Sequence, residues 1–312
     1  MHRGLRFPVL DKIKVAGICH RKALIMKTGI IDVGGGMRDA YGAGILEWCA
    51  DNGVTFDYCI GISAGSANFT SFLSGQKGRN LKFYMDYDHR DEVMSMKNYV
   101  RTRNYVDLEY MYGTLVNSDG ECPLDFQAIL DNPAEYKIVA TNSLSGKPYY
   151  FDNTDMKQDD YGAIKASCCV PAANKPYYVN GTRYFDGGIS DPIPVEKCFE
   201  DGCDVAVLIL TRPRDYKRSP KKDRLTVNVL RKNYPEAAKA MSRRAEVYNA
   251  QLRKAMEYEK QGRLLILAPD DIGGMKTPTK DKEMIEKLYY KGYKDAEAIA
   301  DFLARAKTAA LD

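Results

Sequence analysis

Asp57-Tyr-Cys-Ile-Gly61-Ile-Ser63-Ala-Gly65 is the stretch that decides the expected fold, since a short apolar strand runs directly into Gly-x-Ser-x-Gly and a helix. The two glycines permit a tight strand-to-helix turn that lifts the serine hydroxyl above the edge of a sheet. Ser63 is therefore a candidate nucleophile, and Gly61 and Gly65 form its elbow. Taken alone the pattern is a weak signal, because Gly and Ser are common residues.

Strands and helices alternate on both sides of this stretch. A helix is expected at 41–52, and strands are expected at 28–33, 57–60, 136–140, 148–151 and 205–210. Such alternation predicts an α/β fold with a mostly parallel central sheet, whose sites lie at the carboxyl ends of the strands. Residues 69–112 are dense in Tyr, Phe, Met and charge, so we expect helices or a lid-like insertion there.

The C-terminal third has the pattern of a long helix. Asn233 is a candidate cap and Pro235 suits a first turn. Apolar side chains then recur at helical spacing and indicate a core-facing stripe: Met241, Ala245, Tyr248, Leu252 and Met256.

Composition excludes several classes of protein. The chain has 312 residues and is 45% hydrophobic, which excludes general disorder. Apolar runs such as 205–210 are far shorter than the roughly 20 residues of a membrane span. Charges interrupt residues 1–22 before a secretory signal can form, so we expect a cytoplasmic protein. The eight cysteines form no C-x-x-C pair, and adjacent Cys168 and Cys169 suit neither a metal site nor a disulfide; we expect reduced, mostly buried thiols.

Charge is distributed unevenly along the chain. The net charge of +4 does not predict a nucleic-acid partner. Residues 211–263 nevertheless hold 16 Lys and Arg against 6 Asp and Glu. This segment could face anionic lipid or an acidic substrate, or it could be a solvated, ion-paired helical surface, and both interpretations stay open.

Histidine content restricts how Ser63 could be activated. The three histidines are His2, His20 and His89, and none follows position 89, which rules out a triad in the order Ser, acid, His. His89 lies in a charged segment, 86–91, and is expected at the surface. The remaining candidate base is Asp186, since Gly187 and Gly188 let the backbone turn sharply beside it. The alternative is that Asp-Gly-Gly is only a loop turn.

A glycine-rich loop, Gly34-Gly35-Gly36-Met37-Arg38, follows the first expected strand. Backbone amides in such a loop bind an anion or a developing oxyanion. A dinucleotide site is excluded by spacing, because Asp39 stands where G-x-G-x-x-G would need its last glycine.

Together these motifs resemble the patatin-like phospholipase family. The matching stretches are 32–38 with 44–46, 61–65, 186–188 and 191–194. The resemblance covers roughly residues 28–215, and 208–214 with the helical tail is similar to the bacterial cytoplasmic branch of that family. It implies a three-layer α/β/α fold with a helical C-terminal extension, divided into an N-terminal extension (1–27), a catalytic domain (28–215) and a helical region packed on it (216–312).

The resemblance also implies a chemistry. Ser63 would be the nucleophile of a Ser–Asp dyad, Asp186 its base, and the amides of Gly34, Gly35, Gly36, Met37 and Arg38 the oxyanion hole, with no cofactor and no metal. The expected substrate is a phospholipid or another acyl ester. Residues 212–222 suggest transient contact with the inner face of the membrane. No oligomeric state is predicted.

One residue departs from the family pattern. Asp39 stands where the family usually has glycine, so its carboxylate could repel the oxyanion, or it could bond Arg38 and leave the site intact. A runner-up hypothesis is therefore a catalytically weak or inactive protein of this fold that binds anionic lipid or another ligand. Acyl transfer to an acceptor other than water is a third possibility.

Overall fold

A computed structural model describes residues 26–275 and 279–309. His2, His20 and the segment in which no secretory signal is expected lie outside the described residues.

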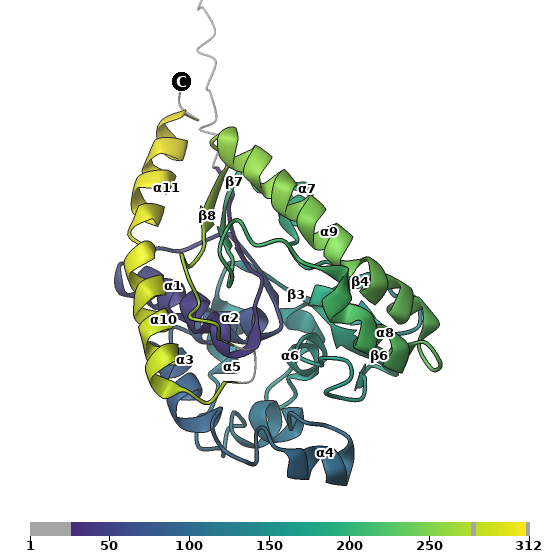
Figure 1. The fold of residues 1–312 in the computed structure, drawn as a ribbon. Coiled ribbons are helices and arrows are strands. Elements are labelled where there is room, and N and C mark those ends of the chain that lie inside the picture. Colours follow the sequence, from purple (N-terminus) through teal and green to yellow (C-terminus); the bar gives the residue numbers. More distant parts are fainter. Residues whose placement is uncertain (1–25, 276–278, 310–312) are drawn as a thin grey trace, which may run out of the picture.

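An eight-stranded sheet forms the centre of the molecule (Figure 1). Its strands are β1 (Thr28–Asp32), β2 (Tyr58–Ile62), β3 (Glu135–Asn142), β4 (Pro148–Asp152), β5 (Tyr177–Val179), β6 (Thr182–Asp186), β7 (Val205–Ile209) and β8 (Leu264–Leu267). Hydrogen-bonded neighbours follow the order β5-β6-β3-β2-β1-β7-β8. β2 and β6 pair with successive parts of one edge of β3, and β4 pairs with its other edge. The pairs β3–β2, β2–β1, β1–β7 and β7–β8 are parallel. β4, β5 and β6 run antiparallel to the strands they pair with. The predicted mostly parallel sheet is confirmed.

Helices cover both faces of the sheet. They are α1 (Ala40–Asp51), α2 (Ala64–Leu73), α3 (Arg79–Lys82), α4 (Met96–Thr102), α5 (Phe126–Asp131), α6 (Gly162–Ser167), α7 (Val195–Glu200), α8 (Arg224–Leu230), α9 (Pro235–Lys260), α10 (Lys282–Asp295) and α11 (Ala298–Ala309). Successive strand residues point to opposite faces, so Ile30 joins the core under α1, α2 and α10, while Ile31 joins the core under α7 and α9. The three-layer α/β/α architecture follows (Figure 1).

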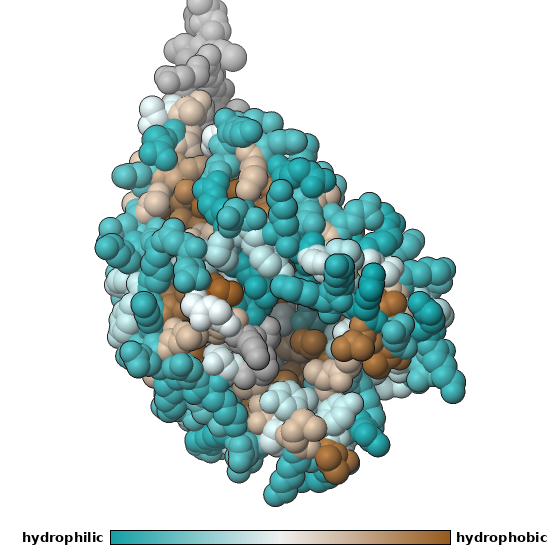
Figure 2. Space-filling model, viewed as in Figure 1, coloured by the Kyte–Doolittle hydropathy of each residue, from teal (hydrophilic) through white to brown (hydrophobic). Residues whose placement is uncertain are grey.

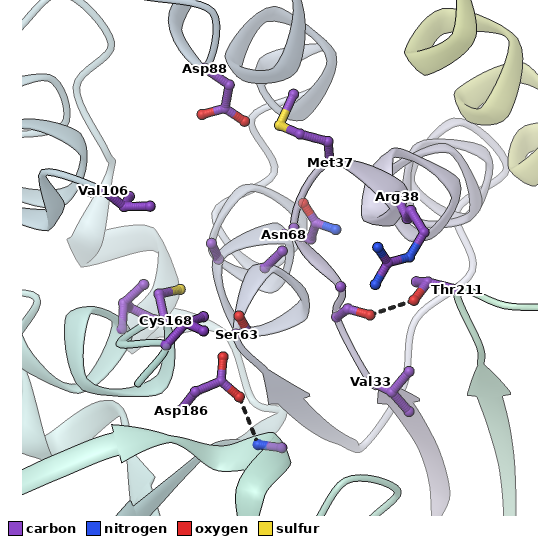
Figure 3. Close-up of a pocket in the computed structure, with 18 of the residues that line it drawn as sticks. Val33, Met37, Arg38, Ser63, Asn68, Asp88, Val106, Cys168, Asp186 and Thr211 are labelled. Atoms are coloured by element: carbon purple, nitrogen blue, oxygen red, sulfur yellow. Dashed lines mark hydrogen bonds between the residues drawn. The ribbon is translucent and has the colours of Figure 1, made fainter. Parts of the chain in front are cut away.

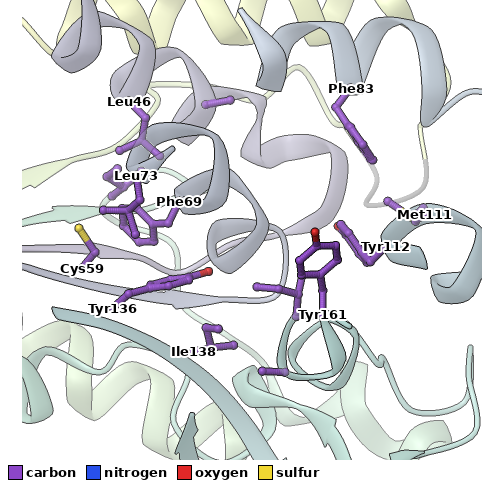
Figure 4. Close-up of a cluster of buried hydrophobic side chains, with 14 of the residues drawn as sticks. Leu46, Cys59, Phe69, Leu73, Phe83, Met111, Tyr112, Tyr136, Ile138 and Tyr161 are labelled. Atoms are coloured by element: carbon purple, nitrogen blue, oxygen red, sulfur yellow. The ribbon is translucent and has the colours of Figure 1, made fainter. Parts of the chain in front are cut away.

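The larger core continues from the sheet into the segment predicted as a lid. Phe69 of α2 meets Tyr136 of β3 edge to face, and further along the same layer the rings of Phe83 and Tyr112 stack (Figure 4). The lid segment comprises α3, α4 and short π-helical turns at Phe83–Tyr87 and Tyr110–Thr114. Its aromatic side chains are therefore core residues that also enclose the space above α2.

The long C-terminal helix α9 agrees with its predicted stripe. Met241, Ala245, Tyr248 and Leu252 are buried, and Met256 packs partly buried against the same core. Pro235 is the first helical residue, but Tyr234 rather than Asn233 occupies the cap position. After α9 the chain returns as β8, which pairs with β7, so the sheet extends beyond residue 215. The domain boundary at this residue stays a prediction.

Two further sequence expectations concern cysteines and membrane spans. The seven cysteines in the described part of the chain are free, and all but half-buried Cys168 are buried. Within the same residues, no helix has both the length and the apolar character needed to cross a bilayer.

Candidate active site

Ser63 occupies a sharp turn between β2 and α2. Its backbone has φ 55° and ψ −128°, a conformation that a residue with a side chain adopts only under constraint. The constraint comes from tight packing: a Cβ on Gly61 would lie 2.6 Å from the Ser66 backbone, and one on Gly65 would lie 2.6 Å from Asp32. Both elbow glycines are therefore required by close approach, as the motif predicts.

Hydrogen bonds hold the Ser63 backbone in place. The Ser63 amide donates to Ser167 Oγ at 2.8 Å, and the Ser167 hydroxyl donates in turn to the Val139 carbonyl at 2.7 Å. The Ser66 hydroxyl donates to the Ser63 carbonyl at 2.6 Å. The nucleophile candidate is thus tied to α6 and β3 as well as to its own helix.

The sheet register brings Asp186 to Ser63. Ile62, the last residue of β2, is paired with Val139 of β3, and Asp186, the last residue of β6, is paired with Ala140. β2 and β6 therefore meet end to end along one edge of β3. A Cβ on Gly187 would lie 2.3 Å from the Val139 carbonyl oxygen, so the turn after Asp186 needs glycine. The Ser63 hydroxyl faces the Asp186 carboxylate (Figure 3).

The environment of Asp186 favours a stronger base than an ordinary aspartate. Burial raises the pKa of this carboxyl. The nearby guanidinium of Arg244, the Ser63 hydroxyl and the Gly188 amide, which donates to Oδ1 at 2.8 Å, act in the opposite direction without cancelling the effect of burial. An ionised carboxylate with a raised pKa accepts a proton more readily.

The glycine-rich loop lies beside the elbow. Gly34, Gly35 and Gly36 all have positive φ (64°, 148° and 58°), which explains the run of three glycines. Thr211, which follows β7, donates to the Gly34 carbonyl at 2.6 Å (Figure 3). The Gly34 amide donates to Asp32 Oδ1 at 3.0 Å, so it already has an acceptor and is not available to an oxyanion. Among described residues the amides of Gly35 and Gly36 have no acceptor.

Asp39 points away from the cavity. It is fully buried behind the loop, where its carboxyl faces Asp32, and Asn68 Nδ2 donates to its Oδ2 at 3.1 Å. A Cβ on Gly42 would lie 2.5 Å from Asp39 Oδ1 and 2.6 Å from Asp32 Oδ2, so this glycine makes room for the pair. Of the two effects expected from the sequence, the interaction with Arg38 is present as an attraction between charges, since the guanidinium acts to lower the pKa of Asp39.

The two buried carboxyl groups titrate as a pair. Burial raises the pKa of Asp32 to about 6, against the opposing effect of the Gly34 amide. The pKa of Asp39 is also raised, by burial and then by the charge of Asp32. Asp32 Oδ2 and Asp39 Oδ1 have no other hydrogen-bond partner among the described residues, so one proton shared between the carboxyls satisfies both.

A cavity of about 490 Å³ opens above Ser63, Asp186 and the glycine loop. One wall is largely apolar and comes from the lid segment and α6, with Phe83, Met94, Leu108, Met111, Tyr112 and Ile164 among its residues. The wall on the side of the glycine loop carries Arg38, Arg212, Arg218, Lys222 and Arg244. The lid therefore lines the cavity as well as covering it.

Several lining residues were not predicted from the sequence. Asp88 was expected in a solvated segment, but it is buried in the cavity wall and burial raises its pKa to about 7. His89 is half-buried rather than solvated, and it does not line this cavity. Arg244 lies on α9, far along the chain from the motifs. Its position three residues after Met241 and four before Tyr248 places it on the inward face of the helix, and this spacing is the one sequence signal that could have identified it.

The family model for the patatin-like phospholipase domain matches residues 33–199, and a domain of unknown function (DUF6363) matches residues 234–305. The uncharacterized protein YjjU of Escherichia coli is 29% identical over 199 residues, 62% of this chain and 54% of that protein. An uncharacterized NTE family protein of Mycobacterium bovis, Mb1092c, is 33% identical over 82 residues, 26% of this chain and 22% of that protein.

Among solved structures, VipD from Legionella pneumophila is similar at a TM-score of 0.48 and 12% identity, covering 88% of this chain and 67% of that one. The chain spans about half or less of the length of the curated relatives it matches.

Proposed function

Because the chain belongs to the patatin-like phospholipase family, we propose that it is a serine hydrolase of lipid acyl esters that uses Ser63 and Asp186 as a dyad. The observation that carries this proposal is the strained Ser63 turn whose hydroxyl faces a buried carboxylate of raised pKa. The amides of Gly35 and Gly36, which have no acceptor within residues 26–275 and 279–309, lie in the loop packed against that turn: a Cβ on Gly34 would be 2.1 Å from the Ile62 carbonyl oxygen.

The proposed reaction has two halves. Asp186 takes the hydroxyl proton as Ser63 Oγ attacks the ester carbonyl, and the resulting oxyanion accepts hydrogen bonds from the Gly35 and Gly36 amides. The C–O bond to the leaving alcohol breaks, the alcohol takes the proton from Asp186, and an acyl-Ser63 ester remains. Water then attacks that ester while Asp186 accepts its proton. The acyl–Oγ bond breaks, Asp186 returns the proton to Ser63 Oγ, and the fatty acid is released.

The apolar wall of the cavity supports an acyl chain as the group transferred to Ser63. Burying methylene groups there is favourable by about 0.8 kcal/mol each. The burial of Asp39 supports an active enzyme over an inactive binding protein, because a fully buried carboxyl is not exposed to an oxyanion in the cavity.

Ester hydrolysis tests the dyad. We expect wild type to release p-nitrophenol from p-nitrophenyl butyrate, and Ser63→Ala and Asp186→Asn each to lose at least about 10³-fold in kcat/KM. Ser242→Ala and Asp215→Asn, which change exposed residues of the same types, serve as matched controls. A fluorophosphonate probe should label wild type but not Ser63→Ala. Wild-type rates in both dyad variants would refute the assignment.

We also propose that the protein is cytoplasmic and meets the inner face of the membrane with the side that carries the cavity mouth. Figure 2 shows this face hollowed at its centre, with hydrophobic side chains near α8 and α4. Leu225 and Val229, one helical turn apart on α8, are 81% and 60% exposed. The exposed cations Lys217, Lys221 and Arg224 are close to them in sequence. Apolar and basic side chains combined in this way favour an anionic lipid surface.

Vesicle sedimentation tests the surface contact. Wild type should pellet with phosphatidylserine vesicles at low salt, less at high salt, and weakly with neutral vesicles. Leu225→Glu should reduce pelleting, whereas Tyr290→Glu, on α10 at the other side of the molecule in Figure 1, should not. Equal pelleting with neutral and anionic vesicles would contradict the proposal.

A further inference from the structure

The side of the cavity next to the glycine loop holds more positive charge than its carboxylates balance. Five cationic side chains line it, and the carboxyl groups that act on them are Asp186, the buried Asp223 and, behind the glycine loop, Asp39. Burial and neighbouring guanidinium groups lower the pKa of Arg244 and of Arg38 to about 10. The cavity thus holds several cations close together, where the charge of each one disfavours the charged form of its neighbours.

These cations are held in fixed positions. Arg218 makes a bidentate pair with Asp223, from Nη2 to Oδ1 at 2.6 Å and from Nε to Oδ2 at 3.1 Å. Backbone groups of Arg218 exchange two hydrogen bonds with the Asn249 side chain of α9, at 2.9 and 3.0 Å. Arg212 lies over the Tyr216 ring at 4.5 Å from its centroid. A preorganised set of guanidinium donors is what binding of a phosphate or carboxylate group requires.

Some donors in this cluster lack acceptors. Arg244 Nε and the Tyr216 hydroxyl are buried, and neither has a hydrogen-bond partner among the residues that the structure describes. Among the described residues, the Arg244 guanidinium has one long carboxylate contact, from Nη1 to Asp223 Oδ1 at 3.9 Å, and the charge of Asp186 also acts on it. Buried donors without acceptors are costly, and an anionic ligand would satisfy them.

The cluster is adjacent to the reacting groups. Arg244 Nη2 and Asp186 Oδ1 each lie 3.0 Å from the position that a Cβ on Gly188 would take. An anion bound by Arg244 would therefore be only a few bonds from an ester carbonyl at Ser63. The apolar wall that would hold the acyl chain comes from the lid segment and α6, and the cations come from the loop after β7 and from α9.

We propose that Arg212, Arg218 and Arg244 form an anion-binding subsite that selects acyl esters with an uncompensated phosphate group close to the scissile ester. The substrate would then be a lipid with a net anionic head group, in preference to a neutral or zwitterionic one. This inference rests on the proposed ester hydrolysis for its substrate, while the binding site itself does not depend on catalysis.

The test compares lipids with one acyl chain and different head groups. We expect kcat/KM for lysophosphatidic acid to exceed that for monoacylglycerol and for lysophosphatidylcholine by about tenfold or more, since hydrogen bonds to charged groups are strong. Arg212→Gln and Arg244→Gln should each reduce this anionic-to-neutral ratio by about tenfold. Because the same dyad hydrolyses all of these lipids, any effect of Arg244 on the pKa of Asp186 is common to them and cancels in the ratio. Arg243→Gln, which changes the exposed arginine next to Arg244 in α9, is the matched control and should leave the ratio unchanged.

Binding without turnover separates the two proposals. Calorimetric titration of Ser63→Ala with lysophosphatidic acid, and with inorganic phosphate, should show tighter binding of the lipid, and Arg212→Gln added to Ser63→Ala should weaken both. Equal affinities would assign the site to free anion and overturn the substrate claim. Hydrolysis with no head-group preference, unchanged in the arginine variants, would overturn the subsite and leave the hydrolase. Arginine-dependent binding without hydrolysis of any ester would overturn the hydrolase and leave the subsite.

Discussion

Replacing Asp32 with asparagine should remove a specific pH dependence from the stability of this protein. Asparagine keeps an oxygen to accept the Gly34 amide, and its NH₂ group can donate to Asp39 Oδ1, which has no other acceptor role among the described residues. The substitution thus replaces the shared proton by a permanent donor without leaving a cavity. Asp32→Ala, in contrast, removes the acceptor of Gly34 and leaves Asp39 alone in the interior.

The magnitude follows from the raised pKa of Asp32. A folded-state pKa of about 6 against an ordinary value of 3.8 is a shift of about two units, equivalent to about 3 kcal/mol. Because the folded pKa is the higher one, this contribution to stability is fully present below about pH 4 and is lost as the pH rises through about 6. Wild type should therefore lose about 3 kcal/mol more than Asp32→Asn as the pH rises from below about 4 to well above 6. Asp88 and Asp186, whose pKa values are also raised, are present in both proteins and cancel. Asp39 does not cancel: the charge of Asp32 raises its pKa further in wild type only, so its titration adds to the loss of wild-type stability.

Urea unfolding in buffers from about pH 4 to about pH 8 measures this difference. Asp215→Asn, at an exposed position, should follow wild type throughout. If wild type and Asp32→Asn lose stability in parallel, the two carboxyls do not share a proton and the reasoning fails. We also expect Asp32→Asn to keep esterase activity at neutral pH and Asp32→Ala to lose it, because the hydrogen bond from the Gly34 N–H to the side chain at position 32 holds the glycine-rich loop in place.

Three more outcomes are expected. Arg244→Gln should move the acidic limb of the kcat/KM profile for p-nitrophenyl butyrate to higher pH, because the guanidinium holds the pKa of Asp186 down and the carboxylate must be ionised to accept a proton; an unmoved limb would contradict this. Gly187→Ala should lower the free energy of unfolding by more than Gly53→Ala, which should cost roughly 1 kcal/mol. The new Cβ at position 187 meets the Val139 carbonyl at 2.3 Å, whereas the one at position 53 has open space around it. Denaturant midpoints of the two variants measure the difference. Leu252→Ala on α9 should destabilise by roughly 2–5 kcal/mol in urea titrations, whereas Arg253→Ala, at an exposed position, should change stability little; equal losses would mean that the stripe is not core.

Local chemistry in the sequence was enough to predict the sheet, the elbow and the stripe of α9. Strand periodicity, Gly-x-Ser-x-Gly and the positive φ of a glycine run depend on residues close together along the chain, so their consequences can be worked out without knowing the fold. The absence of a late histidine likewise needed only the order of residues.

Tertiary structure decided what each side chain meets. Asp186 reaches Ser63 only because β2 and β6 end at neighbouring residues of β3, a register that no local pattern specifies. Asp39 lies behind the glycine-rich loop because Asp32, Asn68 and Gly42 provide a buried place for its carboxyl. Arg244 joins the cavity through the packing of α9 on the sheet. Burial and charge–charge distances depend on the whole fold, and for that reason the residues that tune this site could not be identified from sequence alone.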